Sequence, residues 1–239
     1  MNAVEIKDLV KKYSDFEAVS GLTFDVREGE IFALVGPNGV GKSTTLKTIA
    51  TILTPTSGSV AVFGLDTARE AHGVREIISY LPEEAGAYKN LTGLDYLDFM
   101  ALVFLRDRKK AAAAVAFGSE LSGLKDRLKD KVKTYSKGMT RKLLLARAVM
   151  IKPKLAILDE PTSGLDIVNG YEIRNTIKQL AAGGMTFLIS SHNMSEIEFL
   201  SGRIGVINKG KLLACDTPDA LKRRFSTGDL EEVFIKLTQ

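Results

Sequence analysis

The feature that most constrains the fold is a glycine-rich segment between an unbroken apolar run and a helix-forming stretch. The apolar run, 31–35, is typical of a strand buried on both faces of a parallel sheet. Glycines allow successive backbone N–H groups to point inward and hold phosphate oxygens, and the positive end of the next helix adds to this anion site. The segment therefore predicts a phosphate-binding loop in which Lys42 reaches the β- and γ-phosphates and Ser43 binds Mg²⁺. The predicted nucleotide-binding residues of this loop are Gly36, Pro37, Asn38, Gly39, Val40, Gly41, Lys42, Ser43 and Thr44.

Composition and charge exclude several classes of protein. The 239 residues fit one large domain, and the single cysteine excludes an internal disulfide and a cysteine-cluster metal site. No stretch approaches the roughly 20 apolar residues that cross a bilayer, and the first residues lack the apolar core of a signal peptide. The net charge of +4 comes from short, scattered basic clusters, which are typical of solvated helix faces rather than a nucleic-acid surface. We therefore expect a cytoplasmic protein whose role at a membrane requires a partner.

Apolar runs bounded by turn residues alternate with helical stretches along the chain. The stretch 94–150 is mainly helical and separates the earlier runs from the later ones. The pattern predicts an α/β core interrupted by a helical insertion. Strands are predicted at 4–9, 22–26, 31–35, 60–63, 77–81, 155–158 and 186–189, a helix at 43–53, and a hairpin at 203–214 that turns at 208–210.

Two adjacent acids, Asp159 and Glu160, end the apolar run at 155–158. A phosphate loop needs a carboxylate near its metal and a second group that orients the attacking water. Asp159 is placed to hold Mg²⁺, through water, and Glu160 to polarise the lytic water. Adjacent acids are also common in turns, so the pair alone decides nothing. The segment 161–166 directly after Glu160, and the histidine of 190–192 at the end of the next buried strand, strengthen the hydrolytic interpretation.

A further motif at 135–139 opens a helix that continues to Met150. In type, order and spacing, these motifs resemble those of ABC transporter nucleotide-binding domains over nearly the whole chain. The resemblance implies an α/β P-loop NTPase fold with a RecA-like core and an antiparallel β subdomain. It implies one domain, 1–239, with a helical subdomain inserted at about 85–152. It also implies an ATPase with ATP and Mg²⁺ as its cofactors.

The resemblance assigns a role to each motif. Lys42, Glu160 and His192 take part in catalysis, with His192 as the switch histidine, and Asp166 lies in the D-loop. Tyr13 occupies the place of the aromatic side chain that stacks on adenine, a contact that is tolerant of the base. The signature motif, which contacts ATP held by another copy, comprises Ser136, Lys137, Gly138 and Met139.

The signature serine is informative about partners. Ser136 precedes a helix, where its hydroxyl and the helix N-terminus form a second anion site. By the resemblance, that site completes the ATP site of a second copy, or of a homologous ATPase, in a head-to-tail dimer. The alternative interpretation of Ser136 is an ordinary helix N-cap.

The sequence departs from the family pattern at two motifs. Lys137 and Met139 replace a glycine and the glutamine of the usual signature, and Glu83 stands where the Q-loop has glutamine. Glutamate still offers oxygen to Mg²⁺, so we expect Glu83 to keep a metal-sensing role. These departures and the ending at 230–238 resemble the branch that serves multidrug, lipid, polysaccharide or sodium exporters. The resemblance thus favours export through a separate transmembrane permease, with this chain on the cytoplasmic face of the membrane.

Other functions fit the sequence less well. A GTPase needs an Asn-Lys-x-Asp element, and 208–211 ends in lysine instead. A non-transport ABC ATPase acting on ribosomes or nucleic acid stays the main alternative. It is disfavoured because 84–135 is short and lacks sustained heptads, and because only one ATPase domain is present. A phosphotransferase is weakened because nothing suggests an acceptor pocket, and no nucleic-acid partner is expected.

Overall fold

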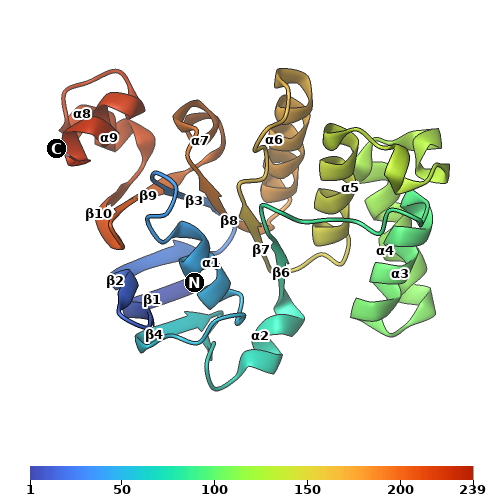
Figure 1. The fold of residues 1–239 in the computed structure, drawn as a ribbon, viewed down its shortest axis with the longest axis horizontal. Helices are drawn as coiled ribbons and strands as arrows, with labels where there is room; N and C mark the ends of the chain where they lie inside the picture. The colour runs from blue at the N-terminus through green and yellow to red at the C-terminus, as the bar shows by residue number, and fades with distance from the viewer. Residues whose placement is uncertain (239) are drawn as a thin grey trace.

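The computed structural model describes residues 1–238, which form two β-sheets and nine α-helices (Figure 1). The larger sheet has six strands in the order β10-β9-β3-β8-β7-β6, all parallel to their neighbours except the β9–β10 hairpin. Every residue of β3, β7 and β8 is buried, as apolar runs at the centre of a parallel sheet require. The strands are β3 (Ile31–Val35), β6 (Ile78–Leu81), β7 (Leu155–Asp159), β8 (Thr186–Ser191), β9 (Arg203–Asn208) and β10 (Lys211–Asp216).

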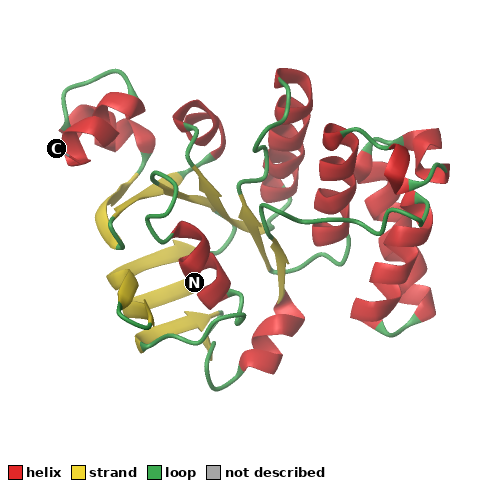
Figure 2. Cartoon of the chain, in the orientation of Figure 1, coloured by secondary structure: helices red, strands yellow, loops and turns green. Residues whose placement is uncertain are grey.

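The smaller sheet is antiparallel, in the order β2-β1-β4-β5, and lies beside the larger one (Figure 2). Side chains from both sheets share one apolar core with helix α1 (Lys42–Ile49). In this core Phe24 of the small sheet stacks on Phe32 of β3, with 5.2 Å between the ring centroids. The shared core fixes α1, and with it the phosphate loop, relative to the small sheet. Its strands are β1 (Asn2–Tyr13), β2 (Phe16–Arg27), β4 (Ser57–Val62) and β5 (Leu65–Asp66).

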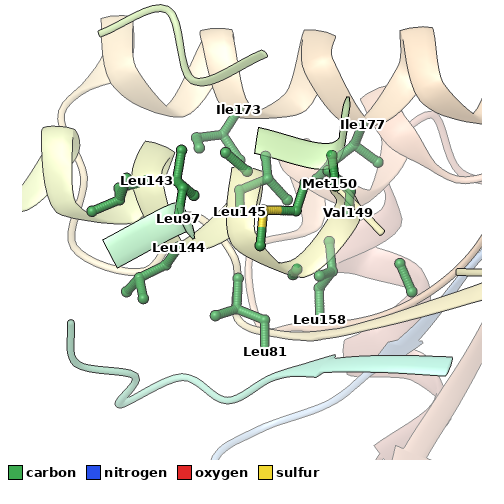
Figure 3. Close-up of a cluster of buried hydrophobic side chains, with 14 of the residues drawn as sticks. Leu81, Leu97, Leu143, Leu144, Leu145, Val149, Met150, Leu158, Ile173 and Ile177 are labelled. Carbon is green, nitrogen blue, oxygen red and sulfur yellow. The ribbon is translucent and has the colours of Figure 1, made fainter. Parts of the chain in front are cut away.

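Helices α3 (Gly93–Leu105), α4 (Arg108–Ser122) and α5 (Lys137–Val149) pack together at one end of the large sheet (Figure 1). Two short 3₁₀ turns, Lys125–Lys129 and Val132–Thr134, connect α4 to α5. The apolar side chains in the middle and end of α5 pack against those of the sheet and of α6, which anchors α5 to the sheet. This cluster contains Leu81, Leu97, Leu143, Leu144, Leu145, Val149, Leu158, Ile173 and Ile177 (Figure 3).

The remaining helices are α2, which leads into β6, and α6 to α9, which follow β7, β8 and β10. Apolar residues of α7, α8 and α9 form a third cluster with β3, β9 and β10. Across the described residues 1–238, no helix combines the length and the apolar character that a bilayer crossing needs. The bounds are Ala71–Ile77 for α2, Ile167–Ala182 for α6, Met194–Leu200 for α7, Pro218–Arg224 for α8 and Leu230–Thr238 for α9.

The structure corrects some predicted element bounds. The helix predicted at 43–53 ends at Ile49, because Thr51 adopts a left-handed φ of 60° and the N–H groups of the next two residues bond to the carbonyl of Lys47. Pro55 follows shortly after and disfavours a longer helix. Ile77 ends helix α2 and does not begin β6. The predicted strands and the hairpin otherwise exist where expected, with β1 and β2 longer than their apolar runs.

Candidate nucleotide site

The glycine-rich loop joins the end of β3 to the start of α1, and two of its glycines are required by geometry. A Cβ on Gly36 would lie 2.2 Å from the carbonyl oxygen of Ile207, and a Cβ on Gly41 would lie 2.4 Å from that of Ala18. Gly41 also has a left-handed φ of 105°, which glycine adopts at no steric cost. Among the described residues, no side chain caps the N-terminus of α1. An uncapped helix N-terminus beside a tight glycine loop favours binding of a phosphate.

A cavity of about 250 Å³ lies over this loop and collects residues from four separate parts of the chain. Tyr13 and Phe16 contribute from the β1–β2 turn, Glu83 from the segment after β6, and Glu160 from the end of β7. Tyr13 and Phe16 are 45% and 63% exposed, whereas Glu160 is buried. The structure thus brings predicted nucleotide-binding and metal residues to one cavity. The loop residues that line it are Asn38, Gly39, Gly41, Lys42, Ser43 and Thr44.

Asp159 lies beneath the loop, at the end of β7, and holds three hydroxyl groups. Its Oδ1 accepts a hydrogen bond from Ser43 Oγ at 3.2 Å and another from Ser190 Oγ, and its Oδ2 accepts one from the Tyr80 hydroxyl at 3.3 Å. Burial, and then the charge of Asp159, raise the pKa of Tyr80, so the phenol stays protonated and donates. Asp159 and Ser43 therefore present adjacent oxygen atoms beside the phosphate loop.

Glu160 joins two cationic or potentially cationic side chains. Its Oε2 lies 2.9 Å from His192 Nδ1, and its Oε1 lies 3.5 Å from Lys42 Nζ. Lys42 is 5% exposed and also donates to the carbonyls of Gly36 and Pro37, at 2.7 and 3.1 Å. Glu160 has a left-handed φ of 48°, a conformation that is costly for a residue with a side chain and that is frequent at functional sites. The three predicted catalytic residues form one connected group.

Arg141, in the first turns of α5, is a residue of the site that sequence reasoning missed. It is 7% exposed, and its three guanidinium nitrogens donate only to backbone carbonyls. Burial lowers its pKa, and the nearby carboxylates of Glu83 and Asp159 oppose that change. A signal existed: Arg141 shares the buried helix face with Leu145 and Ala148. Arg141 fixes the segment after β6 and the end of β7 through Pro82, Glu83, Asp159, Glu160 and Pro161, at 2.7–3.2 Å.

The signature residues lie elsewhere: among the described residues that line the cavity, none belongs to 136–139. Ser136 is the N-cap of α5 and accepts a hydrogen bond from the backbone of Met139 at 3.2 Å. Lys137 and Gly138 lie against the segment that contains Asp166, since a Cβ on Gly138 would lie 2.5 Å from the side chain of Asn169. Asp166 caps α6 by accepting from the Asn169 N–H at 2.9 Å. One chain therefore carries the signature and the phosphate loop as separate sites.

Comparisons with known proteins bear on the family and the fold of the chain. The family described as ABC transporter matches residues 19–163. The chain is 37% identical to the linearmycin resistance ATP-binding protein LnrL of Bacillus subtilis, over 92% of this chain and 71% of LnrL. A solved ATP-binding subunit of an ABC transporter superposes with a TM-score of 0.89 at 29% identity, over 99% of this chain and all of that one. The cassette MJ0796, solved as a dimer bound to ADP and Pi, shares the fold with a TM-score of 0.80 at 24% identity, over 90% of this chain and 98% of that one.

The fold and the matched motifs define an ATPase of the P-loop class, with the predicted α/β core and antiparallel sheet. The chain belongs to the ABC transporter family, as an ATP-binding protein with a role in transport. The family predicted from the motifs is therefore confirmed.

Proposed function

We propose that this chain powers export through a separate transmembrane permease, by closing on ATP as a head-to-tail dimer and opening after hydrolysis. The observation that carries the proposal is the separation of the signature residues 136–139 from the cavity over the phosphate loop. A serine hydroxyl at a helix N-terminus suits an anion, and a second copy would supply that anion. The resistance function in the name of LnrL supports export rather than import.

Within each site, we assign adenine stacking to Tyr13, phosphate binding to Lys42 and water activation to Glu160 with His192. The exposed face of Tyr13 offers a stacking surface at the open side of the cavity. Glu160 is held between an ammonium and an imidazole, so its carboxylate is oriented before a water arrives. Lys42, Glu160 and His192 come from three segments of the chain, which lie together at the carboxyl ends of β3, β7 and β8. The N-terminus of α1 contributes its dipole to the phosphates.

The oxygen donors beside the loop suit Mg²⁺. Ser43 Oγ and the carboxylate of Asp159 are adjacent, and Glu83 lines the same cavity. In the described part of the chain, no three His, Cys, Asp or Glu side chains group as a metal cluster. Mg²⁺ commonly keeps several waters and takes one or two protein oxygens plus substrate phosphates, which these residues allow. When bound, Mg²⁺ would neutralise charge on the phosphates; Ser43, Asp159 and Glu83 would hold it, directly or through water.

Glu83→Ala is expected to raise the Mg²⁺ concentration for half-maximal ATP hydrolysis about tenfold, because an oxygen donor near the metal is lost. Glu83 also accepts from Ser163 Oγ at 3.2 Å, so the substitution removes a link to the segment after Glu160. Hydrolysis rates measured across a Mg²⁺ titration test this. Glu84→Ala is the control, since Glu84 is exposed and does not line the cavity. Equal Mg²⁺ dependence in both variants would remove Glu83 from the metal site.

The dimer proposal also accounts for exposed apolar side chains beside Asp166. Ile167 and Val168, at the start of α6, are 87% and 66% exposed. Large apolar side chains at adjacent exposed positions favour a partner surface. A second copy placed over the signature would meet this segment, because Lys137 and Gly138 contact it within one chain.

We place the permease contact in a cavity of about 240 Å³ between β6 and the helical region, about 85–152, which we treat as an inserted subdomain. Its lining includes the apolar Phe104 and two buried polar atoms, Ser79 Oγ and Arg147 Nε, that lack a hydrogen-bond partner within the described residues. Buried unpartnered groups are costly, so an incoming segment with an apolar side chain and an acceptor oxygen fits this cavity. Such docking would put the chain on the cytoplasmic face of the membrane.

The test is co-purification of tagged Glu160→Gln, loaded with ATP, from detergent-solubilised membranes of its native host. A multi-span membrane protein at near-equal amount, identified by mass spectrometry, is the expected result. The same preparation carrying Arg147→Glu, a substitution in the proposed contact cavity, should lose that partner. Recovery of ribosomal proteins or nucleic acid, with no membrane protein, would overturn the transport proposal and leave the ATPase intact.

A further inference from the structure

A buried carboxylate outside the nucleotide cavity links the two loops that carry Glu160 and His192. Glu196, in the first turn of α7, is only 3% exposed. Its Oε1 accepts a hydrogen bond from Thr162 Oγ1, and its Oε2 accepts one from Ser191 Oγ at 3.0 Å. Burial raises the pKa of Glu196, with the two hydroxyl donors opposing the change. Removing a carboxyl from water is costly, and the two hydroxyl hydrogen bonds offset part of that cost.

The two donors are close in sequence to the reacting groups. Thr162 lies two residues after Glu160, and Ser191 directly precedes His192. His192 Nδ1 and Glu160 Oε2 are 2.9 Å apart. Covalent chain and hydrogen bonds therefore form a closed ring that runs from Glu160 through Thr162, Glu196 and Ser191 to His192, and back to Glu160.

The ring is also held from outside, because Arg141 donates to the carbonyls of Glu160 and Pro161 and the Glu160 N–H donates to Ser190 Oγ at 3.1 Å. Asn193 caps α7 by accepting from the Glu196 N–H at 3.1 Å, and the Asn193 N–H donates to Ser191 Oγ at 3.1 Å. The start of α7 is thereby hydrogen-bonded to Ser191. Among the described contacts, the Thr162 hydroxyl bonds to Glu196 alone, so Glu196 is the side chain that joins Thr162 to Ser191 at the end of β8.

We propose that Glu196 is a positioning residue for hydrolysis, which sets the geometry of Glu160 against His192 from the side away from ATP. The inference rests on the roles proposed above for Glu160 and His192. Glu196 does not line the nucleotide cavity, so its loss acts on turnover rather than on ATP affinity. A displacement of about 1 Å in a catalytic group lowers rates by up to about 100-fold.

An alternative role for Glu196 is purely structural, as an acidic residue in the first turn of a helix. The two roles differ in what they change. A structural role lowers the free energy of unfolding and the folded fraction, but leaves kcat per folded molecule and the pairing with His192 unaffected. A positioning role lowers kcat, and this loss of kcat occurs only when His192 is present.

The first experiment compares Glu196→Ala, Glu196→Gln and Glu198→Ala in the full chain, measuring kcat, ATP affinity and thermal unfolding. Glu196→Ala is expected to lower kcat at least about tenfold while ATP affinity changes less than about threefold. Glutamine keeps an acceptor for one hydroxyl and offers a donor to the other, so Glu196→Gln should restore most of kcat. Glu198 lies in the same helix, is exposed and pairs with Lys222, and its alanine variant should hydrolyse normally.

The second experiment combines Glu196→Ala with His192→Ala. If Glu196 acts through the pair, the double variant should be about as slow as His192→Ala alone. Fully multiplicative losses, or a normal kcat in Glu196→Ala, would overturn the inference. Thr162→Val removes a single bond of the ring without leaving a cavity, and serves if Glu196→Ala fails to fold; it too should lower kcat selectively. Should His192→Ala and Glu160→Gln both hydrolyse normally, the proposed function itself fails, which is a separate outcome.

Discussion

Lys42→Ala is expected to lower the rate of ATP hydrolysis by about 100-fold or more, with weaker ATP binding. The Lys42 ammonium is buried and donates hydrogen bonds to the carbonyls of Gly36 and Pro37. It also lines the cavity over the phosphate loop. A desolvated cation aimed at transferring phosphate oxygens stabilises the charge that develops there far more than a cation in water does. The substitution also leaves Glu160 Oε1 without its cationic neighbour.

Steady-state hydrolysis and equilibrium binding of labelled ATP measure this effect. Lys47→Ala is the matched control, because Lys47 lies in the last turn of the same helix and does not line the cavity. The control should keep both activities. Hydrolysis by Lys42→Ala at close to the unaltered rate would remove Lys42 from the proposed phosphate contact.

Much of this fold was predictable because buried parallel strands have a simple sequence pattern. The run 31–35 has no polar residue and every one of its side chains is buried, so its prediction was complete. Strands β1 and β2 extend beyond their predicted bounds, and the prediction missed the buried Ala18 and Val19 of β2 because Ser20 and Gly21 interrupt the apolar run. The predicted helix at 43–53 was too long because a left-handed turn at Thr51 ends it.

The candidate site was predictable in its motifs but not in its cross-links. Glycine, lysine and paired acids at strand ends have a local pattern, so Lys42 and Glu160 were predicted from sequence. Arg141 contacts residues that are 18 to 59 positions away in the sequence, and the side chain of Glu196 contacts residues that are 5 and 34 positions away. Only the packing at the carboxyl ends of the strands brings these residues together. A charged residue on a buried helix face is the signal that sequence reasoning needed for both.

Glu160→Gln is expected to lower ATP turnover by about 1,000-fold while it preserves ATP binding. The amide has nearly the shape of the carboxylate, but it lacks the negative charge that polarises the lytic water. Lys42 and the loop glycines are unchanged, so the phosphates keep their contacts. ATP then persists in the site, and the proposed head-to-tail dimer should persist with it.

Light scattering after gel filtration, with and without ATP and Mg²⁺, measures that dimer. Glu160→Gln is expected to be a monomer without ATP and a dimer at saturating ATP. Adding Ser136→Ala should weaken the dimer, because the hydroxyl that would reach the partner's ATP is removed while the helix N-terminus remains. If Glu160→Gln stays a monomer at saturating ATP although it binds the nucleotide, the signature residues do not complete a second copy's site. The separation of the two motifs within one chain would then need a different explanation.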